Sequence, residues 1–319
     1  MSDLPVTNCM QDAAREIMIN SFAVLKVNDH LTEKIRAAHN SALGFFDMVD
    51  QESTTTTKHD INAKSSKKIC CKYHAIVDGN LHGYNEPSPS KRLFRAYCHS
   101  NFQPWPEYDD SLRLNSMRLV EELHTLLVDC CRSLIQLHSL SCTLPTPPSR
   151  PSKRQRRMDK EQQLVLEIPN NASDSDKSPL HYFFYHNRRP SVANCSEHVD
   201  RGVLIVVCLT TVPGLEVWKS YERHHRSGRF VCPEVLVHNA RLYQEAEPAC
   251  SNLVCIMAGD QLAPLLARTV EGTDASRVGE HVEKSLYKNR VANLPRACLH
   301  KVRTPLKRSR LSISYELRL

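Results

Sequence analysis

A histidine and an aspartate stand two positions apart at His198 and Asp200, directly before an apolar run over residues 203–210. In an extended backbone, side chains at positions i and i+2 point to the same side, so this imidazole and this carboxylate can bind one cation together. About one His-x-Asp triplet is expected by chance in a chain with 16 histidines. The pair alone therefore fits a surface turn as well as a metal site, and a third ligand has to come from elsewhere.

His300 is the candidate for the third ligand. Two histidines and one carboxylate on one side of an iron ion leave positions open for a chelating co-substrate and for oxygen, as in non-haem Fe(II) oxygenases. Structural zinc sites instead fill all four positions with protein ligands. His198, Asp200 and His300 therefore predict an Fe(II) site. The other histidines are expected to be exposed or hydrogen-bonded, and Cys195 is expected to be a core or pocket-wall thiol.

An alternating segment over residues 310–315 follows ten positions after His300. On a strand, Arg310 and Ser312 face the same side. A guanidinium fork and a hydroxyl on one wall are suited to hold a carboxylate end-on inside a cavity. The pattern predicts that an organic acid is anchored beside the metal.

These segments resemble the isopenicillin N synthase-like family of Fe(II)/2-oxoglutarate dioxygenases. The His-x-Asp strand of the family is similar to residues 195–204 (CSEHVDRGVL), and its GLQV segment is similar to residues 213–218 (PGLEVW). Its Gly-Asp-x-Leu turn is similar to residues 258–262 (AGDQL), its distal His-Arg-Val to residues 300–302, and its Arg-x-Ser to residues 310–312. The N-terminal part, including His82-Gly-Tyr84, resembles the N-terminal region of the family in order, so the resemblance covers nearly the whole chain.

The resemblance implies that His198, Asp200 and His300 hold Fe(II), and that Arg310 and Ser312 bind the distal carboxylate of 2-oxoglutarate. It also implies that Tyr185 contacts this co-substrate. The implied reaction uses O₂, decarboxylates 2-oxoglutarate to succinate and CO₂, and oxidises, most simply hydroxylates, an organic small molecule.

The chain also departs from the family. The interval from His198 to His300 is longer, with extra sequence near residues 221–228 and 268–294, and Val199 replaces a residue that is often polar. The insertions fall where substrate-facing loops can be remodelled, so no relative's substrate is transferred. Some relatives keep the Arg-x-Ser pair for a different acid.

The many short apolar runs predict an antiparallel barrel or jelly roll with a helical N-terminal layer. The resemblance implies, for this α+β fold, a double-stranded β-helix (jelly roll) core. Helical spacing predicts helices over residues 10–18, 31–47 and 112–142, and an extended run predicts a strand over 21–27. Residues 51–68, rich in Thr, Ser and Lys, are expected to form a loop. The C-terminal half holds short runs typical of strands, at residues 163–168, 180–185, 203–210, 215–219, 235–238, 252–257 and 310–315.

Composition argues against a membrane protein, a secreted disulfide-rich protein and a nucleic-acid-binding protein. The chain has 319 residues, 41% of them hydrophobic, and its apolar runs are much shorter than the ~20 residues of a membrane helix. The first residues do not resemble a secretory signal, and the 13 cysteines contain no Cys-x-x-Cys pair, which favours free thiols in a reducing compartment, the cytoplasm. The net charge of +7 is concentrated in residues 145–160 and 301–310 and does not predict nucleic-acid binding.

The expected organisation has three parts: an N-terminal helix and strand region over residues 1–144, a basic, proline-rich linker over 145–160, and the dioxygenase domain over 161–319. The basic cluster in the linker could direct nuclear import, or it could be a solvated loop. Two other functions remain open at this point: a non-catalytic jelly-roll binding protein, and an oxygenase that acts on a protein or nucleic acid. The sequence does not indicate an oligomeric state.

Overall fold

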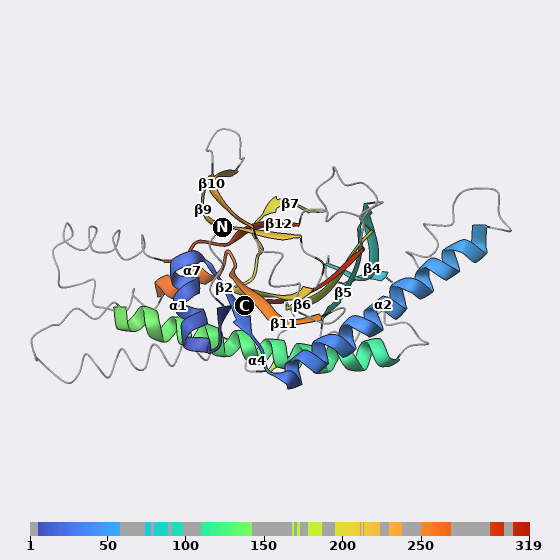
Figure 1. Ribbon diagram of the computed structural model, residues 1–319, viewed down its shortest axis with the longest axis horizontal. Helices are drawn as coiled ribbons and strands as arrows, with labels where there is room; N and C mark the ends of the chain where they lie inside the picture. The colour runs from blue at the N-terminus through green and yellow to red at the C-terminus, as the bar shows by residue number, and fades with distance from the viewer. Residues whose placement is uncertain are drawn as a thin grey trace, which may run out of the picture.

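Two β-sheets face each other, and helices cover the outer face of the larger one (Figure 1). The computed structural model describes residues 6–57, 74–77, 80–88, 91–97, 110–141, 168, 171–172, 178–186, 195–210, 212, 214–223, 230–237, 250–268, 294–302 and 309–319.

The larger sheet has nine strands, and all neighbouring pairs are antiparallel except the first. Its order is β1 (Val6–Thr7), β2 (Phe22–Lys26), β11 (Cys250–Ala258), β8 (Leu204–Thr210), β13 (Arg310–Leu317), β6 (Pro179–Tyr185), β5 (Lys91–Tyr97), β4 (Asn80–Ser88) and β3 (His74–Val77). The smaller sheet is antiparallel throughout, in the order β10 (Phe230–Val237), β9 (Leu215–Arg223), β12 (Leu299–Val302) and β7 (Cys195–His198).

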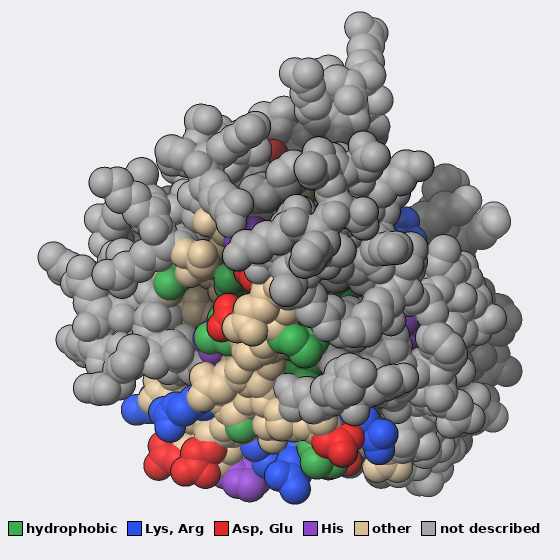
Figure 2. All heavy atoms as spheres, turned by 90° about the vertical axis from the view of Figure 1, so that its right-hand side faces the viewer, with side chains coloured by type: hydrophobic (Ala, Val, Ile, Leu, Met, Phe, Trp, Pro, Cys, Tyr) green, Lys and Arg blue, Asp and Glu red, His purple; other side chains and the backbone are tan. Residues whose placement is uncertain are grey.

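Helices α1 (Met10–Asn20), α2 (Asp29–Thr57) and α4 (Asp110–Ser141) lie along the larger sheet on the side away from the smaller one, and α7 (Leu262–Arg268) follows β11 (Figure 1). Two buried hydrogen bonds fix α4 to the sheet: Ser116 Oγ lies 2.7 Å from the Tyr182 hydroxyl, and His124 Nδ1 lies 2.9 Å from the Tyr315 hydroxyl. Space-filling atoms show charged side chains of both signs along the lower edge of the molecule (Figure 2). Such a surface is the solvent side of amphipathic helices.

Alternation along the strands gives the larger sheet two different faces. On β8, Val206 and Cys208 belong to the core shared with the helices, whereas Ile205 and Val207 belong to the core between the two sheets. The same period of two places the polar residues of β13 between the sheets, because Ile313 and the other alternate residues pack against the helices. The interior of the sandwich is therefore the place where polar side chains gather.

The predicted fold class is confirmed, and some of its elements need correction. Residues 51–57 were expected to form a loop, but they continue α2, because extending an existing helix by one residue is much easier than starting one. Residues 58–68 lie outside the described residues. Periodicity did not predict β3, β4 and β5. The expected strand over 163–168 lies outside the described residues except for Ile168, which is in a bend, and the one over 235–238 is the end of the longer β10. Among the described residues, no helix is long and apolar enough to cross a membrane.

Candidate metal centre

The pairing of β7 with β12 brings two histidines together. His300 lies directly opposite His198 in the register of these strands, and their ring centroids are 4.2 Å apart. Asp200 follows two residues after β7, and its two carboxylate oxygens lie 3.5 Å from His198 Nε2 and 3.4 Å from His300 Nε2. Three potential ligand atoms, one from each side chain, thus lie within 4.8 Å of one another.

The three groups are close enough to interact strongly, although the side chains of His198 and Asp200 are 35% and 21% exposed. Although burial by itself lowers the pKa of His198, hydrogen bonding to Asp200 and Cys195 raises it to about 10. Burial would raise the pKa of Asp200, but the two histidines bring it down to about 2. Desolvation lowers the pKa of the fully enclosed His300. The site therefore holds the ionised carboxylate of Asp200 between a protonated His198 and a neutral His300, and a cation could replace the proton on His198.

The backbone around Asp200 is held by the turn that begins at Gly259. The amide of Asp260 donates to the carbonyl of Asp200 at 3.0 Å, and the amide of Gln261 donates to the carbonyl of Gly202 at 3.2 Å. A Cβ added at Gly259 would lie 1.8 Å from the Gly202 carbonyl oxygen, so only glycine allows this close approach. The Gly-Asp-x-Leu turn predicted from the sequence therefore positions the carboxylate ligand.

The proposed carboxylate anchor lies on the inner face of the larger sheet. Arg310 is 1% exposed, its Nε donates to the carbonyl of Val212 at 3.2 Å, and its guanidinium carbon lies 5.7 Å from the centre of the Tyr185 ring. Tyr185 is directly opposite Arg310 in the register of β6 and β13, and burial raises the pKa of its hydroxyl. Ser312, 4% exposed, occupies the next inward position on β13. All three residues thus lie on one wall of the interior.

The donor groups fit the cofactors that the resemblance implies. Two imidazoles and one carboxylate converge from one side, which is the set that leaves positions of a ferrous ion open. A buried guanidinium and a hydroxyl on one strand suit the far carboxylate of a dicarboxylic acid. The chemistry of this side-chain set is therefore compatible with Fe(II) and 2-oxoglutarate.

Three further polar residues close to the site were not predicted. Arg95 Nε donates to His181 Nε2 at 2.8 Å, and His181 Nδ1 lies 3.5 Å from a carboxylate oxygen of Glu316. His181 shares the inward face of β6 with Tyr185, so the two-residue period from Tyr185 was the signal that could have found it. Arg95 lies on β5, a strand that the periodicity of apolar residues does not predict.

Cys195 belongs to the surroundings of the site, as expected of a pocket-wall thiol. Its sulfur lies 3.7 Å from His198 Nδ1 and 4.0 Å from Lys91 Nζ. Burial would raise the pKa of the thiol, but the contacts with His198 and Lys91 lower it.

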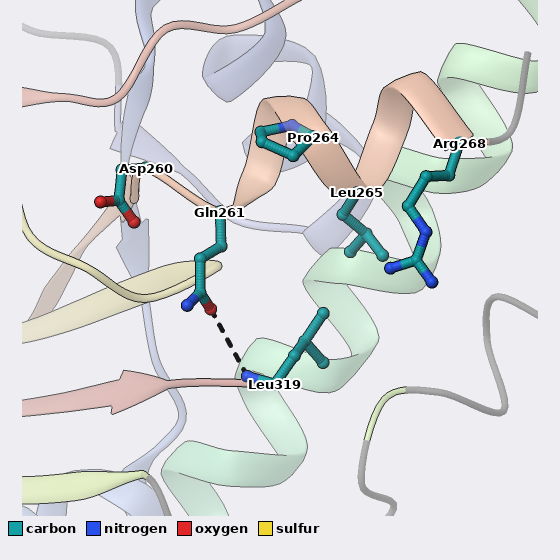
Figure 3. Close-up of a pocket in the computed structure, with 6 residues that line it drawn as sticks. All are labelled: Asp260, Gln261, Pro264, Leu265, Arg268 and Leu319. Carbon is teal, nitrogen blue, oxygen red and sulfur yellow. Dashed lines mark hydrogen bonds between the residues drawn. The ribbon is translucent and has the colours of Figure 1, made fainter.

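A separate pocket lies at the outer end of the same turn. Its volume is about 410 Å³, and its lining residues are Asp260, Gln261, Pro264, Leu265, Arg268 and Leu319 (Figure 3). The side chain of Gln261 points toward Leu319, whose amide donates to Gln261 Oε1 at 3.5 Å. This pocket contains none of the three candidate ligands, so its link to the metal centre is the turn that holds Asp200.

Comparisons with known proteins agree with this geometry at the level of the fold. Neither protein-family models nor curated protein sequences give a match. Solved structures do match. The full-length T7H of Neurospora crassa, in complex with alpha-KG and 5-formyluracil, has a TM-score of 0.56 and 15% identity, covering 97% of this chain and 77% of that one.

Two further solved structures have the same architecture. JOX2, in complex with 2OG, Fe and JA, has a TM-score of 0.54 and 15% identity over 99% of this chain and 75% of that one. The rice dioxygenase for auxin oxidation has a TM-score of 0.51 and 14% identity over 99% of this chain and 83% of that one. The resemblance stated from the sequence is confirmed for the fold: this chain folds as the 2OG-Fe(II) oxygenases do.

Proposed function

We propose that this protein is a non-haem Fe(II)- and 2-oxoglutarate-dependent dioxygenase that oxidises an organic small molecule and releases succinate and CO₂. One observation carries the proposal: His198, Asp200 and His300 converge in the interior of a jelly roll whose opposite wall carries the buried Arg310. The fold is shared with structures that contain alpha-KG or 2OG, which supports the same assignment.

In this proposal, His198, Asp200 and His300 hold Fe(II), which supplies the activation of O₂ when it is bound. Arg310 and Ser312 bind the distal carboxylate of 2-oxoglutarate, and Tyr185 packs beside it. Arg310 is preorganised for this role, because its Nε is already fixed by the carbonyl of Val212. The apolar core between the two sheets adjoins the site and limits the access of water to it.

The direct test is anaerobic binding of Fe(II) and 2-oxoglutarate, followed by a substrate screen for succinate release. We expect His198→Ala and Asp200→Ala to abolish Fe(II) binding and turnover, because each removes one of three ligands. His30→Ala is the matched control, because His30 is 66% exposed on α2 and should leave both unchanged. Substrate-dependent succinate formation that survives in either ligand variant would overturn the assignment.

A small organic molecule is the proposed class of substrate. It is supported by the solved structures with this fold, which include T7H in complex with thymine and JOX2 in complex with JA. The proposal names no individual compound. A screen that compares small molecules with peptides and oligonucleotides tests it, and turnover confined to a peptide or oligonucleotide would contradict it.

The division of the chain and its location are proposals of the same kind. We take residues 161–319 as the unit that carries the site, because every candidate ligand and anchor lies within it, and residues 1–144 as its helical and strand support.

We place the protein in the cytoplasm, with nuclear entry through the basic cluster at residues 153–157. Replacing the four basic residues of this cluster by Gln should shift a fluorescent fusion out of the nucleus, and an unchanged distribution would remove the nuclear role.

A further inference from the structure

The inner face of three neighbouring strands is arranged in rows that run across β13, β6 and β5. Their registers align residues of the three strands directly opposite one another, and the alternate residues pack against the helices. The rows, each given from β13 to β5, are Arg310, Tyr185 and Lys91; then Ser312, Phe183 and Leu93; then Ser314, His181 and Arg95.

The first row is the one that the proposed co-substrate anchor occupies, and the third row lies beyond an intervening row with two apolar members. Glu316, the next inward residue on β13, lies beside the turn after Asp200: a Cβ added at Gly202 would be 3.6 Å from Glu316 Cβ. Arg310 and Glu316 are six residues apart on one strand, or roughly 20 Å at the rise of a β-strand. The third row therefore lies toward the Asp200 end of β13, away from Arg310.

The third row consists of hydrogen-bond donors. His181 is 3% exposed and accepts at Nε2 from Arg95, which leaves the proton of the neutral ring on Nδ1. Among the described residues, His181 Nδ1 has no hydrogen-bond partner, since Glu316 Oε1 is 3.5 Å away in a poor geometry. The Glu316 carboxylate is the group that Nδ1 faces, so the donors left for a further acceptor are the terminal N–H groups of Arg95, which have no hydrogen-bond partner among the described residues.

The charges around this row favour an anion. Glu316 is already paired, because Arg318 Nε donates to it at 2.8 Å. Arg95 and Lys91 are only partly buried, and within the described part of the chain neither has an ion pair with a carboxylate. Lys91 Nζ instead lies 4.6 Å from the centre of the Phe183 ring. Arg95 is thus the cation of the third row that has no carboxylate partner in the described chain, whereas Lys91 stands in the first row and also contacts Cys195.

We propose that Arg95, held by His181, binds the carboxylate of the primary substrate, which is a small organic acid whose apolar body lies along Leu93 and Phe183. The inference rests on the proposed function, because the metal centre defines where the substrate reacts. Lys91 adds positive potential on the same strand. In this assignment, Arg95 touches the substrate and His181 is a positioning residue that fixes the guanidinium.

The test uses a matched pair of probes, phenylacetate and 2-phenylacetamide, which differ in charge but not in shape. Their affinities are measured by calorimetry on the full chain with saturating Mn(II) and 2-oxoglutarate. We expect the wild-type protein to bind the acid more tightly than the amide. Arg95→Gln should weaken the binding of the acid by roughly ten- to a hundred-fold, which corresponds to the loss of a hydrogen bond to a charged group. The affinity for the amide should stay unchanged.

Three further variants make the outcome specific. Arg95→Lys should keep part of the preference for the acid, because it keeps the charge. Arg92→Gln is the matched control: it removes a cation from the same strand, but one that faces the helices and pairs with Asp50. Arg310→Gln should abolish 2-oxoglutarate binding, which separates the anchor of the co-substrate from the acid site.

The two proposals fail in different ways. The substrate assignment is overturned if the wild-type protein binds the acid and the amide with equal affinity. It is also overturned if Arg95→Gln weakens the binding of 2-oxoglutarate rather than the binding of phenylacetate. If Fe(II) and 2-oxoglutarate do not bind at all while the affinity for phenylacetate still depends on Arg95, the dioxygenase assignment is overturned and the acid site remains supported.

Discussion

At the scale of single residues, the geometry of the candidate centre depends on one contact between two glycines. Gly259 approaches the backbone of Gly202 so closely that no side chain fits between them, and the amide next to Gly259 binds the carbonyl of Asp200. The ligand and the turn that holds it are therefore one rigid unit. A change at Gly259 acts on the metal site without touching a ligand.

We predict that Gly259→Ala destabilises the protein by roughly 3 kcal/mol and weakens Fe(II) binding, because the added methyl group overlaps the Gly202 carbonyl. The measurements are urea denaturation and metal titration. Gly44→Ala is the control: this position is exposed inside α2 and has open space around it, so the change should add about 1 kcal/mol of stability. Equal effects at the two glycines would contradict the account.

Most of the site residues could be predicted because their spacing carries chemistry. His198 and Asp200 stand at the two-residue period of a strand, and Arg310 and Ser312 do the same. The same period, counted from Tyr185, could have found His181, but Arg95 could not be found in this way, because its contact with His181 depends on the register of β5 against β6. Nothing in the local sequence fixes which residues of two distant strands come to lie opposite each other.

At the scale of elements, α4 is the support on which the larger sheet rests. Its apolar stripe was readable from the sequence, and Leu123 and the equivalent positions are fully buried against the sheet. The extension of α2 beyond residue 50 was not readable, because Ser and Thr have weak helix propensity and favour turns when considered alone. The strands β3, β4 and β5 were missed for a related reason: their length and type emerge from pairing rather than from a clear alternation of apolar residues.

We predict that Leu123→Ala lowers the free energy of unfolding by about 2 to 5 kcal/mol, since it leaves a cavity between α4 and the sheet. Leu114→Ala on the same helix should change stability by less than about 0.5 kcal/mol, because Leu114 is 49% exposed. Chemical denaturation followed by circular dichroism compares the two. A large loss at Leu114 would show that another surface covers it.

At the scale of the whole molecule, ligand binding and folding are linked. The candidate ligands come from β7, from the turn after it, and from β12, and these segments meet only in the folded chain. A metal ion that binds this set binds the folded state alone and stabilises it by mass action.

We predict that Mn(II) and 2-oxoglutarate together raise the midpoint of thermal unfolding in a concentration-dependent way. A ligand at a hundred times its dissociation constant contributes about 2.7 kcal/mol. Asp200→Asn should lose the metal-dependent part of the shift, and Arg310→Gln the 2-oxoglutarate-dependent part. A shift of the same size in the Asp200 variant would locate the metal elsewhere.

The antiparallel pairing of His198 with His300 also has a consequence for motion. The smaller sheet has four strands, and β7 is an edge strand whose described backbone partner is β12. An ion bound by both strands would act as a cross-link at this margin, so the amide protons of β7 and β12 should exchange with deuterium more slowly in the metal-loaded protein than in the metal-free protein. The far strands β3 and β4 of the larger sheet should exchange at the same rate in both forms.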